Sequence, residues 1–231
     1  MKKRLCILLF IVLTASGLRA ENLPYADYKR LHFGFTLGLN GLDFGFKPTQ
    51  RVIDGRVYQV DVSNVFPGFT VGVIGDLRLA KYFNLRLIPC LHLGQRTISY
   101  TNNIDDEILR NNIKSALITI PLYLKYNAPR INDYRFYLLA GGGLSFDLAR
   151  DRQNPVLLGL MDYYIEFGTG CTIYFTFFRF SPEIKFAIGF NNLLTPLDQR
   201  TKDVLMERDY KYTQALGRIT SRMITLVFNF E

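Results

Sequence analysis

The chain has 231 residues and a formal net charge of +8, a length that suits one large all-β domain or two small ones. Four basic residues lie in the first 20 positions, so the remainder carries +4, which is too mild a charge to indicate a nucleic-acid partner. Beyond that segment the only cysteines are Cys90 and Cys171, which together with two histidines offer no zinc spacing, and we expect neither a metal site nor a disulfide.

The first 20 residues have the parts of a secretory signal peptide. A basic segment at 2–4 precedes a short apolar segment at 5–13, and small residues follow from Ala15 to Ala20. We expect cleavage after Ala20, with residues 21–231 forming one domain. No later stretch approaches the roughly 18 unbroken apolar residues of a membrane helix. If the mature chain enters a membrane, it does so as strands.

Alternation of apolar and polar residues recurs along the mature chain and predicts eight strands. Most reach the roughly 9 to 11 residues that a tilted strand needs to cross a bilayer, whereas ordinary globular strands are about half as long. The predicted strands are Leu31 to Gly41, Pro67 to Leu79, Leu85 to Tyr100, Ile113 to Tyr126, Tyr134 to Leu148, Tyr163 to Phe175, Phe178 to Phe190 and Ile219 to Phe230.

Two irregularities interrupt this pattern. Pro89, Pro121 and Pro182 fall inside predicted strands, where each removes a ladder hydrogen bond, and they predict local bulges. After Gly41 the apolar set changes parity, to Leu42, Phe44 and Phe46, which predicts a further bulge near the outer rim.

The predicted connections alternate in length. Long segments (42–66, 101–112, 149–162 and 191–218) are separated by short ones (80–84, 127–133 and 176–177). Outer-membrane barrels have an even number of strands, short periplasmic turns and longer outer loops. In the first long segment, Asp54 and Gly55 predict a type I′ hairpin that extends beyond the membrane, and the last long segment is charged, with a helical turn expected near Asp203. Both chain ends should therefore be periplasmic.

The two strand faces differ in side-chain size. The bulky apolar face carries residues such as Phe33, Leu122 and Leu226, and the opposite face carries polar residues and many glycines. A soluble lipocalin-like barrel would place the bulky side chains inside, but an eight-stranded barrel has an interior only just wide enough for side chains. The sequence therefore favours a transmembrane antiparallel eight-stranded up-and-down β-barrel with its bulky face toward lipid.

Aromatic residues gather where the short turns would meet the membrane boundary, as in the girdles of outer-membrane barrels. They are Tyr82, Phe83, Tyr126, Tyr134, Phe175, Phe177 and Phe178. The chain ends with Phe228 and Phe230 in alternating register, which resembles the aromatic C-terminal assembly signal of such barrels; Glu231 departs from that pattern.

Ten ionisable residues have the parity of the lumen side: Asp76, Arg86, Arg96, Lys125, Arg135, Asp147, Glu166, Arg179, Glu183 and Lys185. Buried charges must pair, because an unpaired buried charge is costly. We interpret the set as a salt-bridged plug of a pore-free barrel. A gated path and a binding site for a partner's segment are the alternatives.

No arrangement of residues indicates catalysis or a cofactor. His32 and His92 both have inward parity, and no serine or carboxylate stands at a spacing that suggests a triad. A lipid-modifying barrel would need its catalytic group at the outer leaflet. The glycines of "AGGGL" (Ala140 to Leu144) lie within a strand and precede no helix, so they do not form a phosphate loop. We expect a protein that is not an enzyme and has no cofactor.

Two segments carry a family resemblance. "PGFTVGVIGDLRLAKYFNLRLIPCLHLGQRTISY" (Pro67 to Tyr100) and "ALITIPLYLKYNAPRINDYRFYLLAGGGLSFDLA" (Ala116 to Ala149) contain the elements P-G-F-x-x-G, G-D-L-R-L, I-P-L-Y-L-K-Y and G-G-G. Together these elements resemble the PorT family of outer-membrane proteins of Bacteroidota, along nearly all of the mature chain.

That resemblance implies a non-enzymatic component of the type IX secretion system, needed for protein export or for assembly of the translocon. It also implies residence in the outer membrane, among its lipids and with secretion-system membrane proteins as partners. The residues alone leave two alternatives open, a structural or adhesive barrel of general type and a lipid-modifying barrel enzyme.

Overall fold

A computed structural model describes residues 23, 29–48, 52–53, 56–102, 109–149, 159–193 and 216–231. The expected signal peptide, the Asp54 and Gly55 turn and the helical turn expected near Asp203 lie outside these residues. Among the described residues, no helix is long and apolar enough to cross a membrane.

The described residues form a sheet of eleven strands. In chain order these are β1 (Leu31–Pro48), β2 (Val52–Ile53), β3 (Arg56–Val65), β4 (Pro67–Arg78), β5 (Phe83–Leu87), β6 (Cys90–Asn102), β7 (Leu109–Asn127), β8 (Tyr134–Asp147), β9 (Met161–Tyr174), β10 (Arg179–Gly189) and β11 (Leu216–Phe230).

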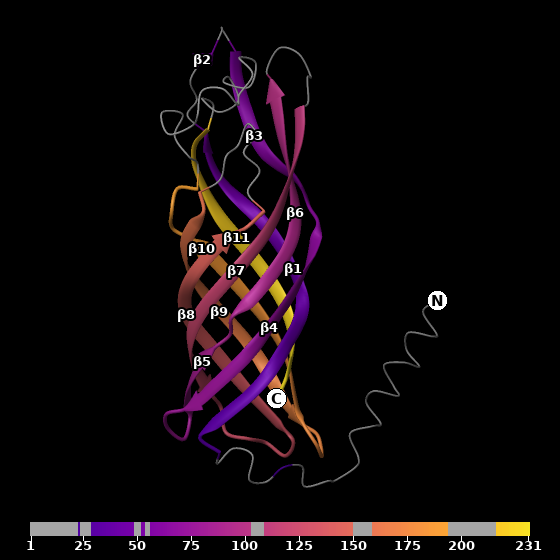
Figure 1. Ribbon diagram of the computed structural model, residues 1–231, viewed down its shortest axis with the longest axis vertical. Coiled ribbons are helices and arrows are strands. Elements are labelled where there is room, and N and C mark those ends of the chain that lie inside the picture. Colours follow the sequence, from indigo (N-terminus) through magenta and orange to yellow (C-terminus); the bar gives the residue numbers. More distant parts are fainter. Residues whose placement is uncertain are drawn as a thin grey trace, which may run out of the picture.

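The sheet closes on itself because β1 pairs antiparallel with both β11 and β4. Around the ring the order is β1, β4, β5 with β6, β7, β8, β9, β10 and β11, which gives eight positions in the wall. Every pairing is antiparallel, and the strands run at a tilt around the barrel (Figure 1). The predicted eight-stranded up-and-down barrel is confirmed.

The predicted third strand is divided into β5 and β6 at Ile88 and Pro89. The register of pairing with β7 is nevertheless the same on both sides of this break, since Leu87 lies opposite Leu122 and Cys90 lies opposite Thr119. The carbonyl oxygen of Pro89 still accepts a hydrogen bond from the Val73 amide, at 3.1 Å. The two short strands therefore make one wall position.

The bulges predicted at the prolines are wrong. Pro121 pairs with Gly143, and Pro182 with Phe228, in ladders that show no shift of register. A proline withdraws one amide donor from the ladder, but it inserts no extra residue, so the pairing resumes with the same offset on its far side.

The bulge predicted after Gly41 is also wrong. β1 pairs with β11 without a shift from Phe35 to Lys47, and the shift falls between Lys47 and Pro48. Leu42 and Phe44 are buried, 1% and 4% exposed, because they continue the inward parity of Asn40. The lumen lining itself changes here from polar to apolar residues.

The connections alternate as predicted. The short turns 79–82, 128–133 and 175–178 lie at the same end as Leu31 and Glu231, whereas β2, β3 and the far ends of β6 and β7 lie at the other end (Figure 1). Val52 pairs with Val57 and Ile53 with Arg56, a register that fits the predicted two-residue hairpin connection. β3 continues the line of β4 and pairs with β6.

The two faces of the wall are as predicted. Outward side chains such as Phe33, Leu122 and Phe136 are 69%, 48% and 61% exposed, whereas inward Thr36 and Thr225 are at most 1% exposed. Aromatic rings cluster on the outside near the short turns, where Phe35 stacks on Phe230 with ring centroids 5.0 Å apart. This end carries the expected girdle.

Candidate functional site

The lumen holds eight charged side chains, four acidic and four basic, between its short-turn end and its middle. Seven of them belong to the ten predicted from strand parity, and the eighth is Glu231. They are Asp76, Glu166, Glu183, Glu231, Arg86, Lys125, Arg179 and Lys185. We call this set the ionic layer.

Arg86, on β5, is the centre of the ionic layer, and its side chain is completely buried. Its Nε donates to Asp76 Oδ2 at 2.7 Å, and its Nη2 donates to Glu231 Oε1. Its Nη1 lies 3.6 Å from Glu183 Oε2. Because β5 and β10 stand on opposite sides of the ring, the contact of Arg86 with Glu183 crosses the lumen.

A second group within the layer surrounds Lys185. Its Nζ lies 3.8 Å from Glu166 Oε1 and 3.6 Å from Glu183 Oε1. On the other side of the lumen, Lys125 lies 3.8 Å from Asp76. Every lysine and arginine of the ionic layer thus has at least one carboxylate within 4 Å, and the charges within this layer balance.

Two buried tyrosines complete this layer, and neither is among the residues predicted from strand parity. Tyr123 donates to Glu166 Oε2 at 2.7 Å, and Tyr137 donates to Glu183 Oε2 at 2.6 Å. The ammonium of Lys125 lies 4.0 Å from the centroid of the Tyr137 ring. The signal that could have identified them is the inward parity that Tyr123 shares with Lys125 on β7 and Tyr137 shares with Arg135 on β8.

Glu231, interpreted from sequence as a departure from the terminal aromatic pattern, is part of the site. Its backbone pairs with Arg179, with hydrogen bonds of 2.8 and 3.0 Å. Its carboxylate accepts from Arg86 and, at 2.7 Å, from Arg179. Its side chain points inward because it alternates with Phe230, so parity could have found this residue too.

Two predicted members lie outside the ionic layer, and the side chain of a third is not described. Arg135 lies at the short-turn rim, where it donates to the carbonyl oxygens of Ala128 and Lys81 at 2.9 and 3.3 Å. Asp147 is buried at the opposite end of the barrel. Arg96 lies in β6, but its side chain is outside the described residues.

An apolar layer lies between the ionic layer and the far end of the lumen. Leu42, Tyr164, Ala187 and Met223 pack together there, with Leu117 against them. They come from β1, β7, β9, β10 and β11, so they cover the cross-section from most of its sides. Together with the ionic layer they make the lumen a packed interior.

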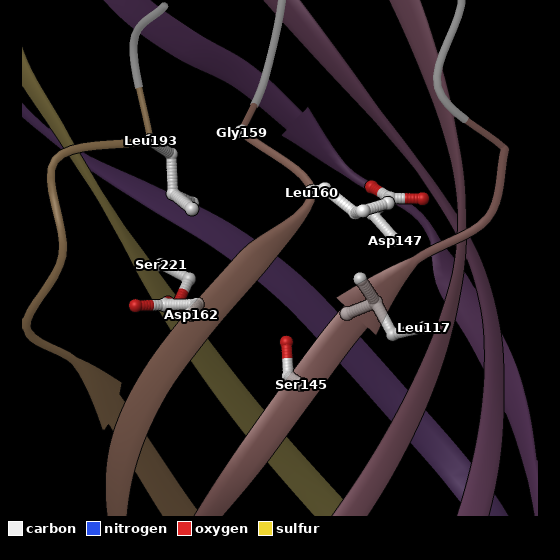
Figure 2. A pocket seen from close by; sticks show the side chains of 8 residues that line it. All are labelled: Leu117, Ser145, Asp147, Gly159, Leu160, Asp162, Leu193 and Ser221. Carbon is white, nitrogen blue, oxygen red and sulfur yellow. The ribbon is translucent and has the colours of Figure 1, made fainter.

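A small hollow opens beyond the apolar layer (Figure 2). Its volume is about 20 Å³, enough for about one water molecule. Ser221 donates to Asp162 on one side, and Asp147 on the other side accepts from the amides of Ala116 and Ala149 at 3.3 and 3.1 Å. Within the described part of the chain, no three His, Cys, Asp or Glu residues are grouped as metal ligands.

His92 is held between two threonines. Its Nδ1 lies 2.9 Å from Thr70 Oγ1, and its Nε2 lies 3.0 Å from Thr119 Oγ1. The ring is 3% exposed and links β4, β6 and β7 inside the wall. His32 lies in register with Asp76, near the short-turn end.

Residues 19–195 match the family model described as "Outer membrane protein beta-barrel domain". Among solved structures, the chain is similar to the outer membrane protein OprG from Pseudomonas aeruginosa, with 13% identity and a TM-score of 0.45 over 87% of this chain and 93% of that one. It is also similar to Ail, the attachment invasion locus protein of Yersinia pestis, with 9% identity and a TM-score of 0.37 over 87% and 99%. Both structural likenesses are too weak to support a statement on function. No curated protein matches the sequence.

Proposed function

The chain belongs to the family of outer membrane protein β-barrel domains, and from this premise we propose that it is a closed, non-enzymatic barrel that serves the type IX secretion system. In this proposal the short turns and both chain ends face the periplasm, as in other barrels of the outer membrane. The long connections face outward, and the partners are membrane proteins of the secretion system.

The observation that carries the proposal is the filled lumen. Arg86 contacts carboxylates from β4, β10 and the chain end at once, and the apolar layer of Leu42 and Met223 lies beyond it. An eight-stranded barrel has no room for a passing polypeptide even before its interior is filled. The contribution to export must therefore come from surfaces that other proteins can reach.

The assignment to type IX secretion is supported by the resemblance to the PorT family. The sequence elements of this resemblance contain residues that are buried in the lumen. G-D-L-R-L contains Asp76, and I-P-L-Y-L-K-Y contains Tyr123 and Lys125. In P-G-F-x-x-G, a Cβ on Gly68 would come within 2.4 Å of Asn40 Oδ1. The resemblance thus includes residues that fill the barrel, although the same elements also contain outward residues such as Leu77 and Leu122.

The experiment is a deletion of the gene in the source bacterium, followed by comparison of the secreted proteins. We expect loss of many proteins that carry a C-terminal sorting domain, and recovery on complementation. An unchanged secretome with lost attachment to surfaces would indicate an adhesive barrel instead. An unchanged secretome with altered lipid A would indicate a lipid-modifying enzyme.

The long connection 191–218 is the surface on which we expect export to depend, because loops on a rigid scaffold are where binding concentrates. A variant with this connection shortened should fold, as shown by heat-modifiable gel mobility, yet restore secretion poorly. Shortening of 149–160, the connection before β9, is the matched control. A folded 191–218 variant that restores full secretion would remove this connection from the proposal.

A further inference from the structure

Basic side chains gather at the short-turn end of the barrel. Apart from Arg179 and Glu231, which pair with each other, six of the described residues there are basic and one is acidic, and the acid, Asp133, is already paired with Arg130 at 3.1 Å. The six are Lys29, Arg30, Arg78, Lys81, Arg130 and Arg135. Glu231, at the same end, points into the lumen.

These residues form one continuous arc of the rim. The amide of Arg78 donates to the carbonyl oxygen of Arg30 at 2.8 Å, which joins the start of β1 to the end of β4. Arg135 donates to the carbonyl oxygen of Lys81 at 3.3 Å, which joins the start of β8 to the turn before β5. The arc therefore follows β1, β4, β5, β7 and β8 around the ring.

The six members of the arc differ in exposure. Arg78, Arg130 and Arg135 are partly buried and engaged with the protein, as shown by Arg130 lying 3.8 Å from the centroid of the Tyr174 ring. The other three present their charge to the surroundings. Lys29, Arg30 and Lys81 are exposed. We call these three residues the rim cations.

The aromatic girdle fixes the depth of the rim cations. Phe83 and Tyr82 contact Tyr126, with ring centroids 5.4 and 6.4 Å away, and this outward cluster lies where the bilayer boundary is expected. The ammonium of Lys81 lies 5.2 Å from the centroid of the Tyr82 ring. The charge therefore stands at the level of the lipid headgroups.

Exposed cations lie at the opposite end of the barrel too. They are Lys114, Arg218 and Arg222, whereas Asp43 is partly exposed and Asp147 and Asp162 are buried. The number of exposed charges therefore does not distinguish the two ends, and the feature that points to lipid at the short-turn end is the contact of Lys81 with the aromatic girdle.

We propose that the rim cations bind the phosphates of anionic phospholipid headgroups in the leaflet at the short-turn end. Each cation adds electrostatic attraction to an anionic membrane surface, and a lysine stem beside an aromatic ring keeps the charged group at the boundary. The inference rests on the membrane-spanning barrel and is independent of the role in secretion, so the two proposals can fail separately.

The test uses the full folded chain reconstituted in phosphatidylcholine membranes with trace amounts of spin-labelled lipid. The ratio of the association of phosphatidylglycerol to that of phosphatidylcholine is measured by electron paramagnetic resonance. We expect a preference of about threefold or more for the anionic lipid, lost at high salt. In the variant Lys29→Gln/Arg30→Gln/Lys81→Gln the ratio should fall to near one.

The matched control is Lys114→Gln/Arg218→Gln/Arg222→Gln, which removes the same number of exposed charges from the other end and should keep the preference. Heat-modifiable gel mobility confirms folding of each variant. If the triple rim variant fails to fold, the single Lys81→Gln replaces it, with a partial loss expected. An unchanged ratio in the folded rim variant, or an equal loss in the control, would overturn the proposal.

Discussion

Arg86 shows how a single residue depends on the rest of the barrel. Its guanidinium is completely buried, and the carboxylates of Asp76, Glu183 and Glu231 surround it. Removal of one partner from a buried ion pair is strongly destabilising, because the remaining charge is left in a medium that solvates it poorly. The charge balance of the ionic layer should therefore matter more than any one contact.

We predict that Arg86→Met lowers the free energy of unfolding by about 3 to 5 kcal/mol, since it leaves the ionic layer with one carboxylate in excess. The second substitution in Arg86→Met/Glu231→Gln restores the balance, so the double variant should be more stable than the single one. Urea titration in detergent, followed by gel mobility, measures both variants. A double variant as unstable as the sum of its single variants would contradict charge balance as the cause.

A control for this prediction is Arg135→Ala at the rim. Arg135 donates to main-chain carbonyls and is only partly buried, so its removal should cost no more than about 1 kcal/mol. A loss as large as that of Arg86→Met would place Arg135 in the ionic layer after all.

Gly141 allows a prediction about close packing within the wall. A Cβ at this position would come within 2.1 Å of the Leu122 carbonyl oxygen, whereas at Gly75 the nearest atom would be 3.9 Å away. Gly141→Ala should therefore destabilise the barrel by about 1 to 3 kcal/mol, and Gly75→Ala should change its stability little. The same urea titration compares them, and equal stabilities would show that the wall relaxes freely at Gly141.

Parity along a strand predicts the side on which a residue lies, but not its height in the barrel. Asp76, Arg86 and Lys185, which parity selected, lie in the lumen. The predicted strand from Tyr134 to Leu148 placed Arg135 and Asp147 near its two ends, but parity could not tell which residues of different strands meet at one height. The height of a residue depends on strand tilt and stagger, which are properties of the closed ring.

At the scale of the element, strand existence and connection lengths were predictable because alternation and length are local signals. The behaviour of irregular positions was not. Pro121 and Pro182 lie in ladders without a shift, and Leu42 and Phe44 are apolar on the inner face. When the inner face of a strand changes from polar to apolar residues, the apolar positions in the sequence change parity. A bulge produces the same change of parity, so the sequence alone does not separate the two cases.

We predict that Phe186→Arg, on the lipid face within β10, destabilises the barrel by about 2 to 4 kcal/mol, because arginine at the bilayer midplane is poorly solvated. Phe190→Arg is the matched control at the end of the same strand, where the expected cost is about 0 to 1 kcal/mol. Both phenylalanines are exposed, at 47% and 52%.

The measurement is folding into phospholipid vesicles as a function of urea concentration. Wild-type stability for Phe186→Arg would mean that the assignment of the lipid face is inverted. Equal losses for the two variants would mean that the two positions do not differ in depth.

At the scale of the whole molecule, closure of the ring creates both the membrane wall and the confined interior. The apolar residues of the wall face outward because lipid surrounds it, and the polar residues meet inside, where they must satisfy one another. The ionic layer and the apolar layer then occupy the lumen in sequence along its axis. A barrel built this way offers its outer wall and its two ends to partners.

The most direct test of this account is the electrical conductance of the purified, folded protein in a planar lipid bilayer, with a general porin as the positive control for insertion measurements. Charged and apolar side chains fill an interior that eight strands leave barely open, so we predict no stable conductance steps. Recovery of the heat-modifiable band from the membrane confirms that the protein was incorporated. Large and steady single-channel currents would contradict the account, because they require a continuous aqueous path through the ionic and apolar layers.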